Sequence, residues 1–173
     1  YEIIPRPAAV GGVPYRLVPV HEFGEEKVLP IGSSFKLWVL GALAEEISAG
    51  RANWDSALPI YDSLKSLPSG TMQEERGGSV HTLREYARAM ISISDNTAAD
   101  HLIARVGRER VEAFMESVTD RPSVNKPMLT TRDMFALKIG NRPGLLDEYF
   151  EAEVDTRREM ISRGGSVFRA QPE

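Results

Sequence analysis

The strongest constraint on the fold is one apolar segment, IGSSFKLWVLGALAEEISAG at residues 31–50. Its apolar residues recur three and four positions apart, which predicts a helix over residues 33–48. Trp38 and Val39 widen the apolar face, so we expect this helix to be buried on most sides. Gly50 is predicted to end it. The residues that define the expected face are Leu37, Leu40, Ala44 and Ile47.

The composition limits what a chain built around this helix does. Its 173 residues, 42% of them apolar, are enough for one domain with a core. The net charge is −4 and the basic residues are scattered, which argues against nucleic acid or an anionic membrane surface as the main partner. The absence of cysteine excludes disulfides, thiol catalysis and cysteine zinc sites. No apolar run approaches the ~18 residues of a membrane span. The chain begins at Tyr1 rather than Met, which we interpret as a processed or cut N-terminus.

The rest of the chain is predicted to be mostly helical. Residues 15–20 and 26–30 are expected to form two short strands around an acidic turn. Residues 51–81 have the composition of an irregular connection, with one short helix at 60–67. Further helices are expected at 82–94, 97–106, 108–118 and 131–139, with one or two more in 145–163 and a tail after them.

Side chains that cap helices mark three of these starts. Thr82 with Glu85 has the spacing of a capping box, and Thr97 with Asp100 has the same spacing. Thr130 is predicted to cap the helix at 131–139 together with Asp133. Gly107 is predicted to end the helix at 97–106.

Ser33 and Lys36 form a Ser-x-x-Lys pair at the start of the apolar helix. Residues three apart lie on one helical face, so Lys36 is expected to reach the Ser33 hydroxyl. A serine hydroxyl is a weak nucleophile until a base takes its proton. A lysine buried among apolar neighbours favours its neutral form, which is able to act as that base. The alternative reading is a helix-capping Ser33 and a Lys36 that extends to solvent.

Ser94-Asp95-Asn96 follows about sixty residues later, between two predicted helices. Ser-x-x-Lys followed by Ser-Asp-Asn is the order found in class A β-lactamases and penicillin-binding proteins. Ser94 is the candidate for passing a proton to a leaving group, and Asn96 for hydrogen bonding a substrate amide. Asp95 and Asn96 are the candidate substrate-binding residues, and the Asp95 side chain is also expected to brace the turn. The alternative is an ordinary turn with Thr97 as an ordinary helix cap.

From about residue 28 to residue 138 the sequence resembles the serine β-lactamase and penicillin-binding protein superfamily. The segments LPIGSSFKLWVLGALAEEI, MISISDNTAADHLI and LTTRDMFAL carry this resemblance, and the last is similar to a helix of class A enzymes. Residues 32–43 and 64–70 are particularly similar to actinobacterial serine hydrolases related to the β-lactamase-like protein of clavulanic acid biosynthesis. The resemblance implies an α/β, β-lactamase/transpeptidase-like fold, of which this chain would supply mostly the helical subdomain plus the first strands.

The same resemblance implies roles for four residues. Ser33 would be the acylated nucleophile and Lys36 its general base, while Ser94 and Asn96 would belong to the second motif. No cofactor is implied, and the spacing of the three histidines does not favour zinc. We expect His101 to be a packed or half-exposed residue rather than a ligand.

Two departures from the family pattern bear on activity. The loop at residues 118–129 has no Glu-x-x-Leu-Asn, which in class A enzymes supplies the base for deacylation. Asp120 is a candidate replacement, with a turn residue as the alternative. The third family motif, Lys-Thr-Gly on a strand, is also absent from the 173 residues. We therefore expect residues 1–173 to be a single, incomplete domain whose sheet is completed by a missing C-terminal segment or a second chain.

The sequence thus predicts a serine hydrolase that forms an acyl-enzyme with an ester, amide or β-lactam carbonyl, with weak or absent β-lactam turnover. Its substrate would be a small molecule or peptide. The alternative is a catalytically degenerate module of the same fold that binds cell-wall fragments or a protein partner. A glutaminase, which also uses Ser-x-x-Lys, is a third hypothesis. By analogy with the family, an extracytoplasmic location is expected.

Overall fold

The computed structural model describes residues 2–5, 15–18, 30–119, 121–139 and 142–167. The chain divides into two compact units, Tyr1–Gly32 and Ser33–Glu173.

The first unit contains one antiparallel hairpin. Strand β1 (Glu2–Pro5) pairs with β2 (Tyr15–Val18), with Glu2 opposite Val18. The strand predicted at 15–20 is therefore confirmed over 15–18. Its partner is β1, which the sequence did not predict. Most of the other predicted strand, 26–30, lies outside the described residues.

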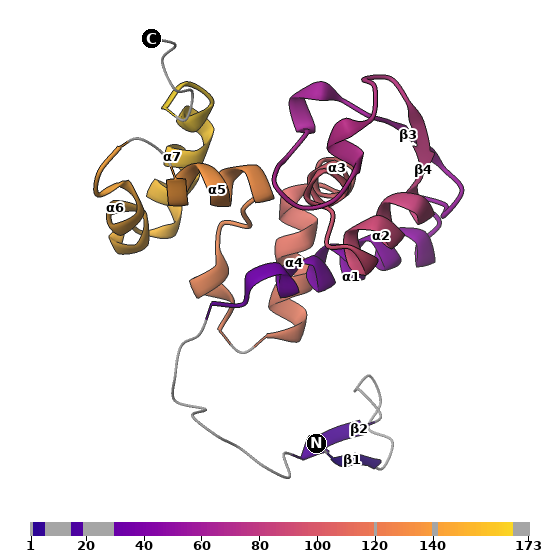
Figure 1. Cartoon of the computed structure of the whole chain (residues 1–173). Coiled ribbons are helices and arrows are strands. Elements are labelled where there is room, and N and C mark those ends of the chain that lie inside the picture. Colours follow the sequence, from indigo (N-terminus) through magenta and orange to yellow (C-terminus); the bar gives the residue numbers. More distant parts are fainter. Residues whose placement is uncertain (1, 6–14, 19–29, 120, 140–141, 168–173) are drawn as a thin grey trace. The chain divides into compact units, whose positions relative to one another are not determined.

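The second unit is helical, and its helices follow the predicted order (Figure 1). A 3₁₀ turn at Gly32–Phe35 leads into the first of them. The remaining predicted helices are confirmed, and the segment predicted to hold one or two helices forms two, the second of which runs on to Val167. The helices are α1 (Lys36–Ser48), α2 (Leu83–Ser92), α3 (Asn96–Val106), α4 (Arg108–Val118), α5 (Thr131–Ile139), α6 (Leu145–Glu151) and α7 (Val154–Val167).

Two of the three predicted caps are confirmed. Thr82 and Glu85 exchange the two hydrogen bonds of a capping box at α2. Thr130 and Asp133 do the same at α5, where each side chain accepts from the other's backbone N–H. Gly107, with φ of +98°, ends α3 as predicted.

The predicted cap at Thr97 is wrong. Asp95 caps α3, since its side chain accepts from the Ala98 N–H. The Thr97 hydroxyl instead donates to the Ser66 carbonyl and accepts from the Ser66 N–H. Thr97 and Asp100 thus have the spacing of a box, but both side chains bond to partners distant in the sequence.

The predicted apolar face of α1 is only partly confirmed. Leu40 and Ile47 are half-buried against the core, but Leu37 is 59% exposed, whereas Lys36 is only 2% exposed. The buried stripe of α1 consists of Lys36, Val39, Ala42, Leu43 and Glu46. These positions are three or four apart and so lie on one side of the helix. Apolar periodicity missed this face because two of its five positions carry charge.

The connection between α1 and α2 holds a second small sheet. Strand β3 (Ala57–Pro59) pairs antiparallel with β4 (Val80–Thr82). The short helix predicted at 60–67 is a single 3₁₀ turn at Asp62–Leu64. Another such turn follows at Met72–Glu74. The remainder of this segment runs along the start of α3, which matters for the site.

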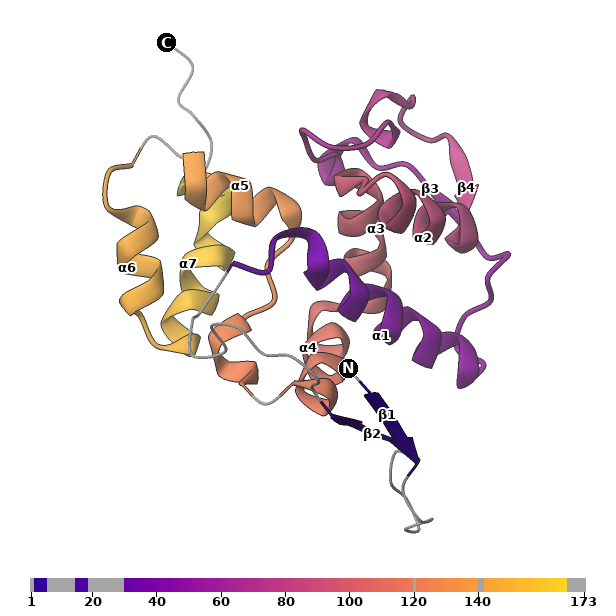
Figure 2. The ribbon, with the colours of Figure 1, turned by 60° about the horizontal axis from the view of Figure 1, so that its bottom comes forward.

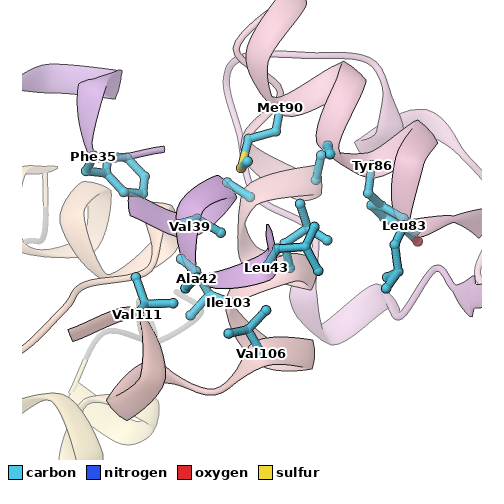
Figure 3. Close-up of a cluster of buried hydrophobic side chains, with 14 of the residues drawn as sticks. Phe35, Val39, Ala42, Leu43, Leu83, Tyr86, Met90, Ile103, Val106 and Val111 are labelled. Atoms are coloured by element: carbon cyan, nitrogen blue, oxygen red, sulfur yellow. The ribbon is translucent and has the colours of Figure 1, made fainter. Parts of the chain in front are cut away.

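Helix α3 is the centre of the second unit, in contact with α1, α2, α4 and α5. It is buried almost all round, and the fully buried Ala98 and Ala99 let its neighbours approach closely. Figure 2 shows α5, α6 and α7 gathered on the opposite side of this unit from β3 and β4. Figure 3 shows side chains of α1, α2, α3 and α4 meeting in the core, among them Val39, Leu43, Leu83, Tyr86, Met90, Ile103 and Val111.

Ion pairs between buried carboxylates and partly exposed arginines join α4 to its neighbours. Glu46 of α1 accepts from Arg110 of α4 at 2.5 Å and from Arg51 at 2.8 Å. Glu112 of α4 pairs with Arg158 of α7 and accepts from the Met128 N–H at 2.8 Å. Each carboxylate is almost inaccessible and has more than one donor, as buried charges require.

The close contact between α1 and α4 depends on Gly41. A Cβ at this position would lie 2.1 Å from Cζ of Phe114. Gly41→Ala should therefore destabilise the protein by about 1–3 kcal/mol, because the Phe114 ring must shift. In a Phe114→Ala background the same change should be neutral or stabilising by up to about 1 kcal/mol, since alanine favours a helix over glycine. Urea unfolding of the four proteins measures both effects. Additive effects of the two substitutions would contradict the contact.

Candidate active site

The Lys36 amine lies against the turn between α2 and α3. Its Nζ donates to the Ser94 carbonyl at 2.5 Å, to Ser94 Oγ at 3.0 Å and to Asn96 Oδ1 at 2.8 Å. Lys36 enters this site because it is the first residue of the buried stripe of α1. The structure thus brings together three of the five predicted site residues: Lys36, Ser94 and Asn96.

Two opposing effects act on the charge of Lys36. Burial lowers the pKa of the ammonium, because the interior solvates a cation less well than water. The carboxylates of Asp95 and Asp100 act in the opposite direction and raise that pKa. The positive end of the α3 dipole also disfavours a cation at this place. The reading in which Lys36 extends to solvent is wrong, since the residue is 2% exposed.

Ser94 has an unusual backbone conformation. Its φ is +57°, and it is the one residue other than glycine with positive φ within the described parts of the chain. This conformation costs free energy for a residue with a Cβ and is found where surrounding contacts impose it. Here it brings both the carbonyl and the hydroxyl of Ser94 to the same Lys36 amine.

The Asp95 side chain holds this turn from the inside. It is 0% exposed, and its carboxylate accepts from the N–H groups of Thr71 at 2.7 Å, Met72 at 2.9 Å and Ala98 at 2.8 Å. Gly70 makes the approach possible, because a Cβ there would lie 2.6 Å from the Asp95 Cα and 2.1 Å from Oδ2. The carboxylate faces the protein interior and is committed to backbone donors.

Asn96 joins the Lys36 amine to the preceding loop. Its Oδ1 accepts from Lys36, its Nδ2 donates to the Leu67 carbonyl at 3.2 Å, and its backbone N–H donates to the Ser69 carbonyl at 2.9 Å. One N–H of the side-chain amide is left for a further acceptor. Its role as a substrate-binding residue stays a prediction.

Ser33 lies in the 3₁₀ turn that precedes α1, and its side chain is exposed. In a 3₁₀ turn residues three apart eclipse, which favours Ser33 above Lys36 on one side of the turn. The hydrogen bonds described for Lys36 run to the second motif rather than to Ser33. Contact between the Ser33 hydroxyl and the amine stays a prediction.

A buried polar network lies behind the site, and sequence reasoning missed it. Asp100 is 2% exposed and accepts from the Thr131 N–H at 2.7 Å, the Thr131 hydroxyl at 2.8 Å and the Arg132 N–H at 3.1 Å. Thr131 Oγ1 also lies 2.7 Å from Ser66 Oγ and 3.3 Å from the Asn96 carbonyl. Burial raises the pKa of Asp100 to about 6, against the opposing hydrogen bonds from Thr131 and Arg132.

His101 is a packed interior residue, as predicted. Its Nε2 accepts from the Tyr61 N–H at 2.9 Å, so its Nδ1 must carry the proton that it shares with the Thr97 carbonyl at 2.7 Å. The ring stacks on Tyr86 with centroids 5.3 Å apart. Burial lowers the pKa of this imidazole.

Other predicted features lie elsewhere or outside the described residues. Asp120 and His21 are among the residues that the structure does not describe. Lys65 donates to the Glu75 carbonyl and pairs with Asp62. In the described parts of the chain no three His, Asp or Glu side chains gather as a metal site would require. None of the described helices is both long and apolar enough to cross a membrane.

Comparisons with known proteins bear on the family and the fold. A model described as the beta-lactamase enzyme family matches residues 20–153. A beta-lactamase of Rhodobacter capsulatus is 36% identical over 100 residues, which is 57% of this chain and 34% of that protein. Among solved structures, a beta-lactamase of Sphaerobacter thermophilus covers 75% of this chain with a TM-score of 0.52 and 24% identity. A mutant of PBP-A in an acyl-enzyme complex with penicillin G covers 73%, with the same TM-score and identity.

The predicted β-lactamase/transpeptidase-like α/β fold is confirmed by these structural neighbours, and the described residues form its mostly helical part. The chain spans 34% of the length of the curated relative, 52% of the Sphaerobacter structure and 54% of the PBP-A mutant structure. The particular similarity to actinobacterial serine hydrolases stays a prediction.

Asp95 should be essential to the stability of the turn. Asp95→Asn replaces one acceptor oxygen by an amide that faces backbone N–H donors, which should cost about 2–4 kcal/mol of unfolding free energy. Asp55→Asn is the matched control, because Asp55 is exposed and its only described charge partner is the exposed Arg84. That control should change stability by less than about 0.5 kcal/mol. Equal unfolding free energies for the two variants would contradict the role of Asp95.

His101 should make stability depend on pH. Because its folded-state pKa lies below the ordinary 6.5, the unfolded chain binds the proton first as the pH falls. The stabilisation is therefore present above pH 6.5 and is lost below it, at up to about 1.4 kcal/mol per pH unit. His101→Gln keeps a donor and an acceptor but does not titrate. The difference in urea-unfolding free energy between the two proteins should shift with pH below 6.5, and a constant difference would contradict a neutral His101.

Proposed function

The chain belongs to the beta-lactamase enzyme family, and on that premise we propose that it is a serine hydrolase that forms an acyl-enzyme at Ser33. The observation that supports this proposal is the Lys36 amine, buried and hydrogen bonded to both ends of the Ser94-Asp95-Asn96 turn. In the described hydrogen bonds the amine contacts neutral oxygens only. The nearby carboxylates of Asp95 and Asp100 accept from backbone N–H groups and from the Thr131 hydroxyl instead.

The contacts of Lys36 suit a neutral amine as well as an ammonium. A neutral amine has two N–H donors and one lone pair. The Ser94 carbonyl and Asn96 Oδ1 are acceptors only, so they take the two N–H groups. Ser94 Oγ, at 3.0 Å, is a hydroxyl and is able to donate to the lone pair. The site therefore accommodates both protonation states of the base without rearrangement.

The proposed proton path uses these contacts after a first step between Ser33 and Lys36. Ser33 Oγ attacks the substrate carbonyl carbon, and its proton passes to the Lys36 lone pair. When the tetrahedral intermediate collapses, the bond to the leaving group breaks and the Ser94 hydroxyl gives that group its proton. Lys36 returns a proton to Ser94 across the 3.0 Å contact. The Ser33 acyl ester is then released by water.

The substrate class follows from the chemistry rather than from a described pocket. An ester, amide or β-lactam carbonyl on a small molecule or peptide suits this proton path. Slow release of the acyl group is proposed because the sequence has no Glu-x-x-Leu-Asn in the loop before α5. We assign Asp95 a positioning role behind the turn, rather than direct substrate contact. An extracytoplasmic location and completion of the sheet by a further segment or chain belong to the same proposal.

The second candidate is a degenerate module that binds cell-wall fragments or a protein partner without forming an acyl-enzyme. It is favoured by the described hydrogen bonds of Lys36, which run to the second motif rather than to Ser33. The two candidates differ in one observable, since only the hydrolase forms a covalent bond between Ser33 and the substrate.

A fluorescent penicillin and a fluorophosphonate probe test the proposal. At least one should label the complete protein, with the added mass on a peptide that contains Ser33. Ser33→Ala should abolish labelling. Lys36→Arg keeps the positive charge but supplies no lone pair, so the labelling rate should fall by about 10²-fold or more.

Ser34→Ala is the matched control, because Ser34 lies in the same 3₁₀ turn and is also exposed. It should leave the labelling rate unchanged. The hydrolase proposal fails if neither probe labels the folded complete protein, or if label remains on the Ser33→Ala variant. Specific but noncovalent binding of peptidoglycan fragments in that case would favour the second candidate.

A further inference from the structure

Asp100 is a buried carboxyl that the proposed proton path does not use. It lies one helical turn after Asn96 on α3, so the two side chains are on the same face. Asn96 binds the Lys36 amine at 2.8 Å, and Asp100 is one of two carboxylates whose charge acts on that amine. Asp100 is therefore directly behind the group that contacts the proposed base.

Thr131 lies between Asp100 and the site. Its hydroxyl donates its one proton to Asp100 Oδ1 at 2.8 Å and lies 3.3 Å from the Asn96 carbonyl, a second acceptor. The Thr131 and Arg132 N–H groups at the start of α5 also point to the carboxylate. The carboxylate thus fixes α5 against the residue that holds Lys36.

The charges around this network are few. Lys36 of α1 faces it with positive charge, and Asp95 at the start of α3 and Asp133 of α5 are the negative groups that act on Lys36 or on Asp100. Asp133 is paired with Arg108 at 3.0 Å. The N-terminal ends of α3 and α5 add positive dipoles. Asp100 is therefore a charge whose removal should be felt at Lys36.

We propose that Asp100 is a positioning residue for the serine chemistry: through Thr131 and Asn96 it fixes the Lys36 amine, and its carboxylate holds that amine protonated between acylation events. This inference rests on the proposed function at Ser33. The Asp100 charge then lowers the fraction of Lys36 that is neutral, and so slows acylation, because the neutral amine is the reactive form. Removing the charge should free the lone pair at lower pH.

The sign of the effect differs on the two sides of pH 6. Since burial raises the pKa of Asp100 to about 6, the carboxyl is neutral below that pH and charged above it. Above pH 6 the charged carboxylate attracts the Lys36 proton. Asp100→Asn removes this attraction at neutral pH and keeps a side chain of the same shape.

The direct test is an NMR titration of Lys36 Cε in the complete protein, which needs no enzymatic activity. In Asp100→Asn the Lys36 titration should move to lower pH by about one unit. Asp100→Glu keeps the charge and should titrate like the unchanged protein. The rising limb of the pH profile of the probe-labelling rate should shift to lower pH by the same amount in Asp100→Asn.

Asp133→Asn is the matched control. Asp133 also accepts a backbone N–H at the start of α5, from Thr130 at 3.0 Å, but its charge is paired with Arg108 and acts on Asp100. Both variants loosen α5. If the Lys36 titration shifts only in Asp100→Asn, the lost Asp100 charge is the cause of the shift. The proposal is overturned if Lys36 titrates at the same pH in Asp100→Asn and the unchanged protein, or if Asp133→Asn shifts it equally.

Two further measurements keep the inference testable. If Asp100→Asn does not fold, the unchanged protein still decides, because its Lys36 Cε signal should show a second inflection near pH 6 as Asp100 ionises. A single inflection would overturn the proposal. If neither probe labels Ser33, the proposed function is contradicted. The Lys36 titration would still show whether the Asp100 charge changes the pKa of the amine.

Discussion

The contact on which the site depends is the one between the Lys36 amine and the turn from α2 to α3. A lysine nitrogen with almost no access to water must have each N–H bonded, or the fold loses several kcal/mol. The turn meets this demand with two oxygens of Ser94 and one of Asn96. The same hydrogen bonds hold Ser94 in a backbone conformation that a residue with a Cβ rarely adopts. The buried amine and the turn therefore stabilise each other.

The turn is also held from two further directions, which gives the site its rigidity. Asp95 binds the loop at Thr71 and Met72, where the lack of a Cβ at Gly70 permits close approach. Asp100, behind it, binds the start of α5. Both carboxylates carry negative charge next to a buried cation, yet neither contacts it in the described hydrogen bonds. The two charges thus raise the pKa of Lys36 against the larger effect of burial, which lowers it, while neutral groups contact the amine. This arrangement suits a base that must change its charge during the reaction.

Local patterns in the sequence predicted the helices and the motif residues, whereas contacts between distant segments could not be read from it. The Thr82 and Glu85 box and the Thr130 and Asp133 pair are local, and both were predicted correctly. Thr97 and Asp100 have the same spacing but bond to Ser66 and Thr131, because tertiary contacts took precedence over the local cap. Periodicity failed on α1, where it counted Leu37 as buried and gave no weight to a cation on the inner face. Strands β3 and β4, of three residues each, were too short for any pattern to reveal.

The central claim is that Lys36 is an internal residue that binds both ends of the second motif. A crystal structure of the complete protein, at a resolution that places side-chain nitrogens, tests it most directly. The account predicts Lys36 Nζ within about 3.2 Å of both Ser94 Oγ and Asn96 Oδ1, with Ser94 at positive φ. A Lys36 side chain that points into solvent, or a Ser94 of ordinary backbone conformation with its hydroxyl turned away, would contradict it.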